Sequence, residues 1–145
     1  MASHSFTVVS NLGIDDAYAR AIDLERVPEW DEGVTGSTRV DDDENGASRF
    51  DVTVTGFDGR PDSVVYTVTD ADAPNRFVMV GENEVFRAVD TLVFATADGG
   101  GSTLDYHGTL ELLGDDPPLS PAQLDSMFPK IAAVAEAGLT RYLNP

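Results

Sequence analysis

Residues 102–142 read STLDYHGTLELLGDDPPLSPAQLDSMFPKIAAVAEAGLTRY, and two different periodicities meet within them. In the first part, every second residue from Leu104 to Leu112 is apolar or small, and the residues between them are mostly polar. This period of two predicts a strand at about 102–113 with one dry face. The acidic and proline-rich residues 115–118 then end the strand.

The second part of this stretch repeats its apolar residues at helical spacing. They form one stripe along a long helix and are Leu124, Phe128, Ile131, Ala135, Leu139 and Tyr142. Ser120 can cap this helix, Pro121 suits its first position and Gln123 completes a capping box. Pro129 falls inside the pattern and removes one backbone hydrogen bond, so a kink or a restarted helix is expected between Ser126 and Pro129.

Upstream of this stretch, alternation of apolar and polar residues predicts a series of further strands. They are expected at about 34–41, 47–56, 62–71, 75–82 and 84–96. Because short turns rich in Gly, Asn and Asp join these segments, we expect antiparallel hairpins. Before them, residues 5–10 are expected to form a first strand, followed by a helix that Asp15 or Asp16 caps and that ends before Pro28.

The composition restricts the class of protein. A length of 145 residues predicts one domain over 1–145, and the absence of Cys excludes disulfide scaffolds and thiol catalysis. The 26 Asp and Glu residues against 9 Lys and Arg give a formal net charge of -17. Because this field repels phosphate backbones and anionic head groups, neither nucleic-acid binding nor membrane insertion is expected.

The same acidic excess is typical of a salt-adapted surface or of a GC-rich genome. The chain shows no apolar run of membrane-spanning length and no basic segment followed by an apolar one at its start, so a cytoplasmic location is expected.

The two histidines do not indicate a metal site or a catalytic base. His4 lies in a terminus that is expected to fray, and His107 should point to the wet face because it adjoins Tyr106. We therefore expect no metal and no cofactor.

One polar residue interrupts the dry strand faces. The inward set of residues 86–94 consists of Phe86, Ala88, Leu92 and Phe94, with Asp90 in its middle. Since a lone buried carboxylate is costly, Asp90 is either a structural residue bonded to neighbouring strands, a residue that a bulge turns outward, or an anchor or general acid/base in a cavity. If this strand slips by one residue, Arg87 points inward and Asp90 outward.

Two segments carry a family resemblance. They are Val27-Pro28-Glu29-Trp30-Asp31-Glu32-Gly33-Val34 and Gly100-Gly101-Ser102-Thr103-Leu104-Asp105-Tyr106. Together with the order of the expected elements, they resemble the SRPBCC superfamily, in particular its polyketide cyclase/dehydrase-like branch. The resemblance implies an α+β helix-grip fold, in which a curved seven-stranded antiparallel sheet wraps around the long C-terminal helix and two short helices follow the first strand. It also implies a cavity for an apolar ligand.

Members of this superfamily include lipid carriers, hormone receptors, polyketide aromatase/cyclases, ubiquinone-binding proteins and chaperone activators, so the resemblance leaves the contents of the cavity open. Our first hypothesis is a binding module, a monomer or weak homodimer, for a small lipid-like or aromatic hydrophobic molecule. The second is an enzyme of cyclase, aromatase or dehydratase type in which Asp90 moves protons together with Tyr66 or Tyr106. The third is a protein-partner module that resembles a chaperone co-factor.

The expected ligand-binding residues come from the dry strand faces, the Trp30 segment and the helix stripe. They are Trp30, Phe50, Val52, Val54, Tyr66, Val68, Phe77, Met79, Phe86, Asp90, Leu92, Tyr106, Leu110, Phe128, Ile131, Ala135 and Leu139. Trp30 either plugs one end of the sheet or forms a wall at the mouth of the cavity. Tyr66 and Tyr106 are either core aromatics bonded to the backbone or donors that orient a ligand carbonyl.

Overall fold

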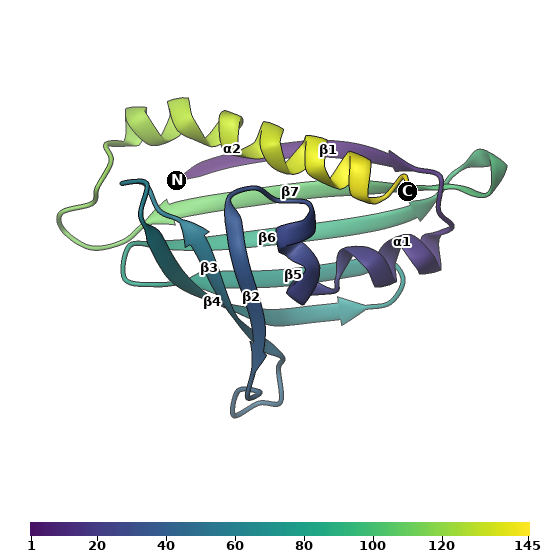
Figure 1. The fold of residues 1–145 in the computed structure, drawn as a ribbon, viewed down its shortest axis with the longest axis horizontal. Helices are drawn as coiled ribbons and strands as arrows, with labels where there is room; N and C mark the ends of the chain where they lie inside the picture. The colour runs from purple at the N-terminus through teal and green to yellow at the C-terminus, as the bar shows by residue number, and fades with distance from the viewer.

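A computed structural model describes residues 1–145 as one curved antiparallel sheet with a long helix laid across it (Figure 1). The strands are β1 (Ala2–Ser10), β2 (Val34–Val40), β3 (Arg49–Thr55), β4 (Pro61–Asp72), β5 (Arg76–Glu82), β6 (Phe86–Thr96) and β7 (Ser102–Leu112). The helices are α1 (Ile14–Ala21), the short 3-10 helices η1 (Leu24–Glu29) and η2 (Asp98–Gly100), and α2 (Pro121–Tyr142). This architecture confirms the expected helix-grip α+β fold.

The sheet order is β1-β7-β6-β5-β4-β3-β2, so every strand from β2 to β7 pairs with its neighbours in sequence. Only β1 breaks this order, because it pairs with β7 at one edge of the sheet. Hairpin turns join the consecutive strands, as the turn residues predict. The curvature brings β2, β3 and β4 across the front of the molecule, while α2 runs along β1 (Figure 1).

The N-terminal strand is longer than predicted. All residues of β1 from Ala2 onward pair with β7, and His4 lies opposite Gly108. The expectation that His4 lies in a fraying terminus is therefore wrong, because the long β7 provides hydrogen-bonding partners over the whole of β1. The predicted cap of α1 is also wrong: Gly13 occupies the N-cap, and Asp15 and Asp16 lie in the first turn, where their charges favour the helix dipole.

The helix α2 begins as its sequence predicts and ends at Tyr142, the last residue of the predicted stripe. Ser120 accepts a hydrogen bond from the backbone of Gln123, and the Gln123 side chain bonds back to the backbone of Ser120. The helix then runs without a break across Pro129, so the predicted restart does not occur. Later in the helix, Gly138 lies against the backbone carbonyl of Trp30, and a Cβ at this position would overlap that oxygen. This close approach sets the distance between α2 and the segment after η1.

The interior contains two groups of buried apolar side chains. The larger group joins α1, the Trp30 segment and the end of α2 to the sheet and includes Leu24, Leu104 and Leu139. The smaller group lies around Val64 and Phe128. None of the helices is both long enough and apolar enough to cross a membrane.

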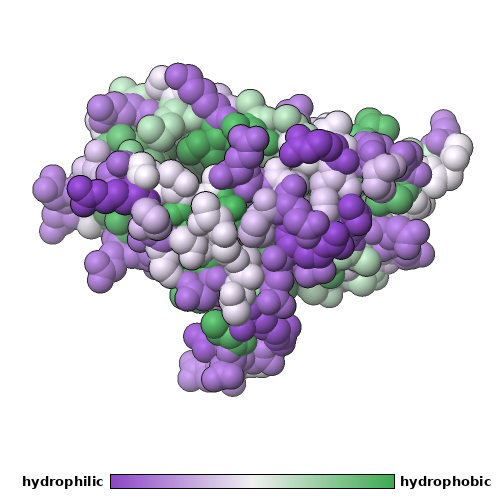
Figure 2. All heavy atoms as spheres, viewed as in Figure 1, coloured by the Kyte–Doolittle hydropathy of each residue, from purple (hydrophilic) through white to green (hydrophobic).

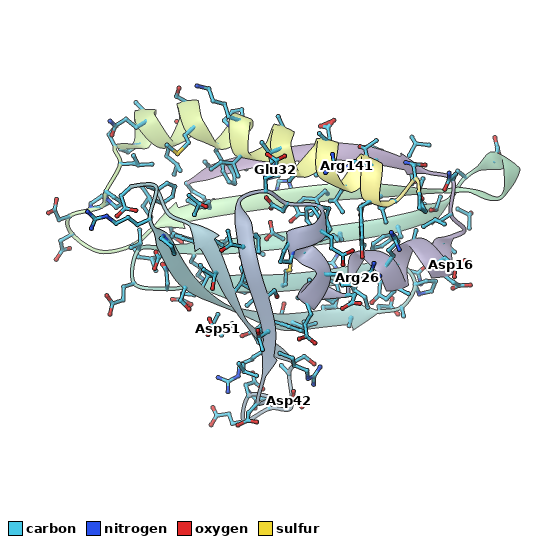
Figure 3. The ribbon with its side chains drawn as sticks, in the orientation of Figure 1. Asp16, Arg26, Glu32, Asp42, Asp51 and Arg141 are labelled. Atoms are coloured by element: carbon cyan, nitrogen blue, oxygen red, sulfur yellow. The ribbon has the colours of Figure 1, made fainter.

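The surface carries the acidic excess without matching cations. The ion pairs are Arg26 with Glu29, Arg39 with Asp42 and Arg76 with Asp70, and all of them are exposed. Figure 3 shows Asp42 in the β2–β3 hairpin at the bottom of the view, away from the body of the sheet. Most acidic side chains therefore have no basic partner, and dissolved cations must screen their mutual repulsion.

Candidate ligand-binding cavity

A cavity of about 240 Å³ lies between the concave face of the sheet and the elements that cross it. Twenty-five residues line it, and 17 of them are hydrophobic. Its apolar walls come from η1, from strands β2 to β7 and from α2, and include Leu24, Val27, Val34, Val52, Val54, Met79, Phe86, Ala88, Leu110, Phe128, Ile131, Ala132 and Ala135. A small number of polar side chains interrupts this apolar surface, which is the usual composition of a small-molecule site.

Most of the residues predicted to bind a ligand lie on this wall. They are Trp30, Val52, Val54, Tyr66, Met79, Phe86, Asp90, Tyr106, Leu110, Phe128, Ile131 and Ala135. The structure corrects the position of five others, Phe50, Val68, Phe77, Leu92 and Leu139, which lie in or against the larger apolar core and not on the cavity wall. Alternation identifies the inward face of a strand, but the cavity occupies only part of that face, and packing closes the rest.

The register of β6 decides which side chain enters the cavity. Asp90 lies opposite Gly108 of β7 and Met79 of β5, and no bulge interrupts either pairing. Asp90 therefore lines the cavity, while Arg87 is exposed on the outer face. The alternative register, with Arg87 inside, is wrong.

Gly108 creates a niche in the floor of the sheet. It pairs with His4 on one side and with Asp90 on the other, so these three residues form a row across β1, β7 and β6. A Cβ at Gly108 would lie 2.7 Å from His4 Nε2 and 2.9 Å from Asp90 Oδ1, so these two polar atoms are less than 6 Å apart. The absence of a side chain at Gly108 leaves room for both groups at one point of the cavity.

The carboxyl group of Asp90 has an unusual environment. Its pKa is raised to about 7, mainly by burial. A hydrogen bond from the Tyr106 hydroxyl lowers the pKa, and the nearby charge of Asp31 raises it. Burial also raises the pKa of Tyr66 and of Tyr106, and the charge of Asp90 adds to both shifts. At neutral pH the site thus holds a carboxyl group that can exchange a proton beside two protonated phenols.

His4 and Asp31 are cavity residues that sequence reasoning missed. Burial and the neighbouring His107 lower the pKa of His4, and His4 Nδ1 is buried without a hydrogen-bond partner. Asp31 accepts a hydrogen bond of 2.9 Å from the backbone N–H of Gly33, and burial raises its pKa. Asp31 lies in the irregular segment after η1, so no helical or strand periodicity could predict its position on the cavity wall. No three His, Asp or Glu side chains come together as metal ligands would.

Trp30 forms part of the cavity wall. Its side chain is 5% exposed, and its indole N–H is buried without a partner. Its backbone contacts α2 at Gly138. Trp30 therefore belongs both to the larger apolar core and to the cavity wall.

Comparison with known families identifies the fold. The family model described as "Polyketide cyclase / dehydrase and lipid transport" matches residues 1–142. The chain belongs to this family. The polyketide cyclase family is part of the SRPBCC/START-like helix-grip superfamily, whose fold is typical of proteins that bind hydrophobic ligands. No curated protein matches the chain.

Solved structures agree with this family assignment at the level of the fold. A START superfamily protein from Mycobacterium smegmatis is 12% identical, with a TM-score of 0.80 over 97% of this chain and 96% of that chain. The protein TTHA0849 from Thermus thermophilus is 19% identical, with a TM-score of 0.76 over 98% of this chain and 94% of that chain. The di-domain ARO/CYC StfQ from the steffimycin biosynthetic pathway is 14% identical, with a TM-score of 0.73, and the match covers 97% of this chain and 49% of that chain.

Proposed function

We propose that this member of the polyketide cyclase family binds a small, mainly apolar molecule in the cavity between the sheet and α2. The observation that carries this proposal is the cavity itself, with its 17 hydrophobic lining residues and few polar ones. Its volume of about 240 Å³ is somewhat below the usual range of about 300–1,000 Å³ for ligand sites. The occupant is therefore a compact molecule and not a long two-chain lipid.

Part of the cavity wall is exposed on α2. Ile131 lines the cavity and is also 43% exposed, and Val134, one turn away, is 40% exposed. Figure 2 shows apolar residues gathered along α2 on a face that is otherwise mostly hydrophilic. An apolar ligand can contact the apolar side chains of α2 before it enters the cavity. This contact reduces the apolar surface that the ligand exposes to water during entry.

The single tryptophan makes the proposal directly testable. Because Trp30 is the only Trp of the chain and lies on the cavity wall, its fluorescence should respond when octanol enters the cavity. Small molecules extracted from the purified protein and identified by mass spectrometry would show the natural class of ligand. A fluorescence signal that does not change or saturate with octanol, together with an empty extract, would contradict the proposal.

Two neighbouring alanines of α2 offer a matched pair of variants. Ala132 lines the cavity, whereas Ala133 is exposed and does not line it. Ala132→Phe should fill the cavity and abolish octanol binding, while Ala133→Phe should bind as the parent protein does. Equal binding by the two variants would place the ligand elsewhere.

A second candidate function is an enzyme of cyclase type, and the environment of Asp90 favours it. An aldol closure needs a base for the carbon next to one carbonyl. Asp90 would take that proton, the enolate carbon would bond to a second carbonyl carbon, and the oxygen of that carbonyl would receive the proton. Atoms and electrons balance without a redox partner, and a carboxyl with a pKa of about 7 can serve in both protonation states.

This second function is tested by turnover and not by binding. Asp90→Asn should abolish cyclisation of a poly-β-ketone substrate while leaving octanol binding in place, and Tyr106→Phe should slow it. Unchanged turnover in Asp90→Asn would remove Asp90 from the mechanism.

A further inference from the structure

The carboxyl groups of the cavity wall have no Lys or Arg beside them on that wall. Three carboxyl groups line it, those of Asp31, Asp62 and Asp90, and no Lys or Arg does. The one basic ring on the wall, His4, has a pKa that burial lowers, so this imidazole is neutral near pH 7. A neutral imidazole carries one acceptor nitrogen in addition to its N–H. The polar part of the cavity therefore contains several acceptors and no cation.

None of the three carboxyl groups forms an ion pair with a basic side chain. The Asp62 carboxylate accepts hydrogen bonds from the backbone N–H of Ser63 at 2.9 Å and from the Asn83 side chain at 3.2 Å. The Asp31 carboxylate accepts one from the backbone N–H of Gly33. Asp90 interacts with the Tyr106 hydroxyl and forms no ion pair. A carboxylate removed from water without a counter-charge is costly, and a charge-assisted hydrogen bond from a cation would reduce that cost.

The aromatic rings of the wall are a second feature that bears on the ligand. Trp30 is 95% buried, since only 5% of its surface is exposed. Trp30, Tyr66 and Tyr106 all line the same cavity as Asp90. The faces of such rings attract cations, and Trp does so most strongly. Ring faces and carboxylates together suit a ligand with an apolar body and one positive charge.

We propose that the cavity selects its ligand by charge and takes an apolar amine, whose ammonium group lies beside Asp90 and His4 on the cavity wall. This inference rests on the proposed binding function and adds the class of ligand to it. The ammonium group donates to the Asp90 carboxylate and to a free acceptor such as the His4 ring nitrogen. A carboxylate head group is rejected, because Asp31 and Asp90 repel it and no cation of the wall can pair with it.

Three ligands with the same chain and different head groups test this selectivity. Octylamine, octanol and octanoate are titrated against Trp30 fluorescence at about pH 8, where the amine is protonated and the Asp90 carboxyl is mainly ionised. Octylamine should bind at least about tenfold more tightly than octanol, which is the size expected for one charge-assisted hydrogen bond, and octanoate should bind most weakly. Titrations in molar salt suppress attraction by the acidic surface.

Two variants separate the effect of the Asp90 carboxyl group from that of the overall charge. Asp90→Asn should reduce octylamine binding to the level of octanol, whereas Asp125→Asn, which removes the same charge from the exposed side of α2, should keep the preference. Circular dichroism checks that each variant is folded. If Asp90→Asn does not fold, Asp31→Asn is used in its place and should weaken the preference.

The outcomes distinguish this inference from the function on which it rests. Octanol and octylamine binding with equal affinity, octanoate binding as tightly as octylamine, or a preference that persists in Asp90→Asn would each overturn the charge selectivity and leave the binding function intact. If none of the three ligands binds, the proposed function fails, and the inference fails with it.

Discussion

Replacing Asp90 with Asn should make the protein more stable at alkaline pH, because the native fold holds this carboxyl in a place that disfavours its charge. The pKa of Asp90 is raised from 3.8 to about 7 in the native state. The native state therefore binds the proton more tightly than the unfolded chain. The contribution to stability is complete below the unfolded pKa and is lost as the pH rises through about 7.

The size of the effect follows from the two pKa values. Raising the pH from about 5 to 8 ionises Asp90 in the native state and lowers the free energy of unfolding. The two pKa values give a loss of about 3 kcal/mol, which a discount for solvent screening reduces to about 2 kcal/mol. Asp90→Asn removes this loss and keeps a side chain of the same shape next to Tyr106. The free energy of unfolding of the variant, minus that of the parent, should thus increase by about 2 kcal/mol from pH 5 to pH 8.

Urea denaturation followed by circular dichroism, at both pH values and constant high salt, measures this difference. Subtracting the parent removes the contributions of His4 and Asp31, whose pKa values also shift on folding. Asp125→Asn, on the exposed side of α2, serves as the control and should show no such increase. If the free energy of unfolding changes with pH in the same way in the parent and in Asp90→Asn, the native fold does not raise the pKa of Asp90. That result would refute the reasoning about the cavity.

Three further predictions concern the fold and its surface. Gly138→Ala should lower the free energy of unfolding, measured by urea denaturation, by about 1–3 kcal/mol, because the new Cβ overlaps the Trp30 carbonyl. Ala137→Ser on the exposed side of the helix should change it little, and equal losses in the two variants would contradict the close approach. Ser120→Ala removes the capping box with Gln123 and should cost about 1 kcal/mol, so an unchanged urea midpoint would show that the cap contributes nothing. The melting temperature should rise from low to molar salt, because ions screen 26 acidic against 9 basic side chains; a flat response in a thermal melt would exclude salt adaptation.

Local patterns predicted most strands and helices well because these elements follow from short-range rules, whereas the helix-grip arrangement was implied by the family resemblance. The alternation from Leu104 to Leu112 identified β7, and the capping box at Ser120 marked the start of α2. Errors arose where contacts distant in sequence outweigh local preference. Pro129 does not break α2, since the helix gains its stability from packing its stripe on the sheet, and β1 extends to Ala2 because β7 pairs with all of it.

The candidate site was predicted only in part. Alternation placed Asp90, Tyr66 and Tyr106 on the inner face, and the structure lines the cavity with all three. Alternation also included Phe77, and the helical stripe included Leu139; both lie in packed core, because a pattern along one strand or helix contains no information about how far a cavity extends. The choice between inward Asp90 and inward Arg87 also required the observed pairing of β6 with β7.

By itself, the sequence determined the elements, their antiparallel order, the acidic surface and the faces that turn inward, since each depends on residues close together in the chain. Only the tertiary structure decided that His4, Gly108 and Asp90 meet in one row and that Asp31 joins them from the segment after η1. Their separations in sequence are long, and only strand register and the close contact of Gly138 with Trp30 bring them to one cavity. Register and packing are properties of the whole sheet, so no local pattern encodes them.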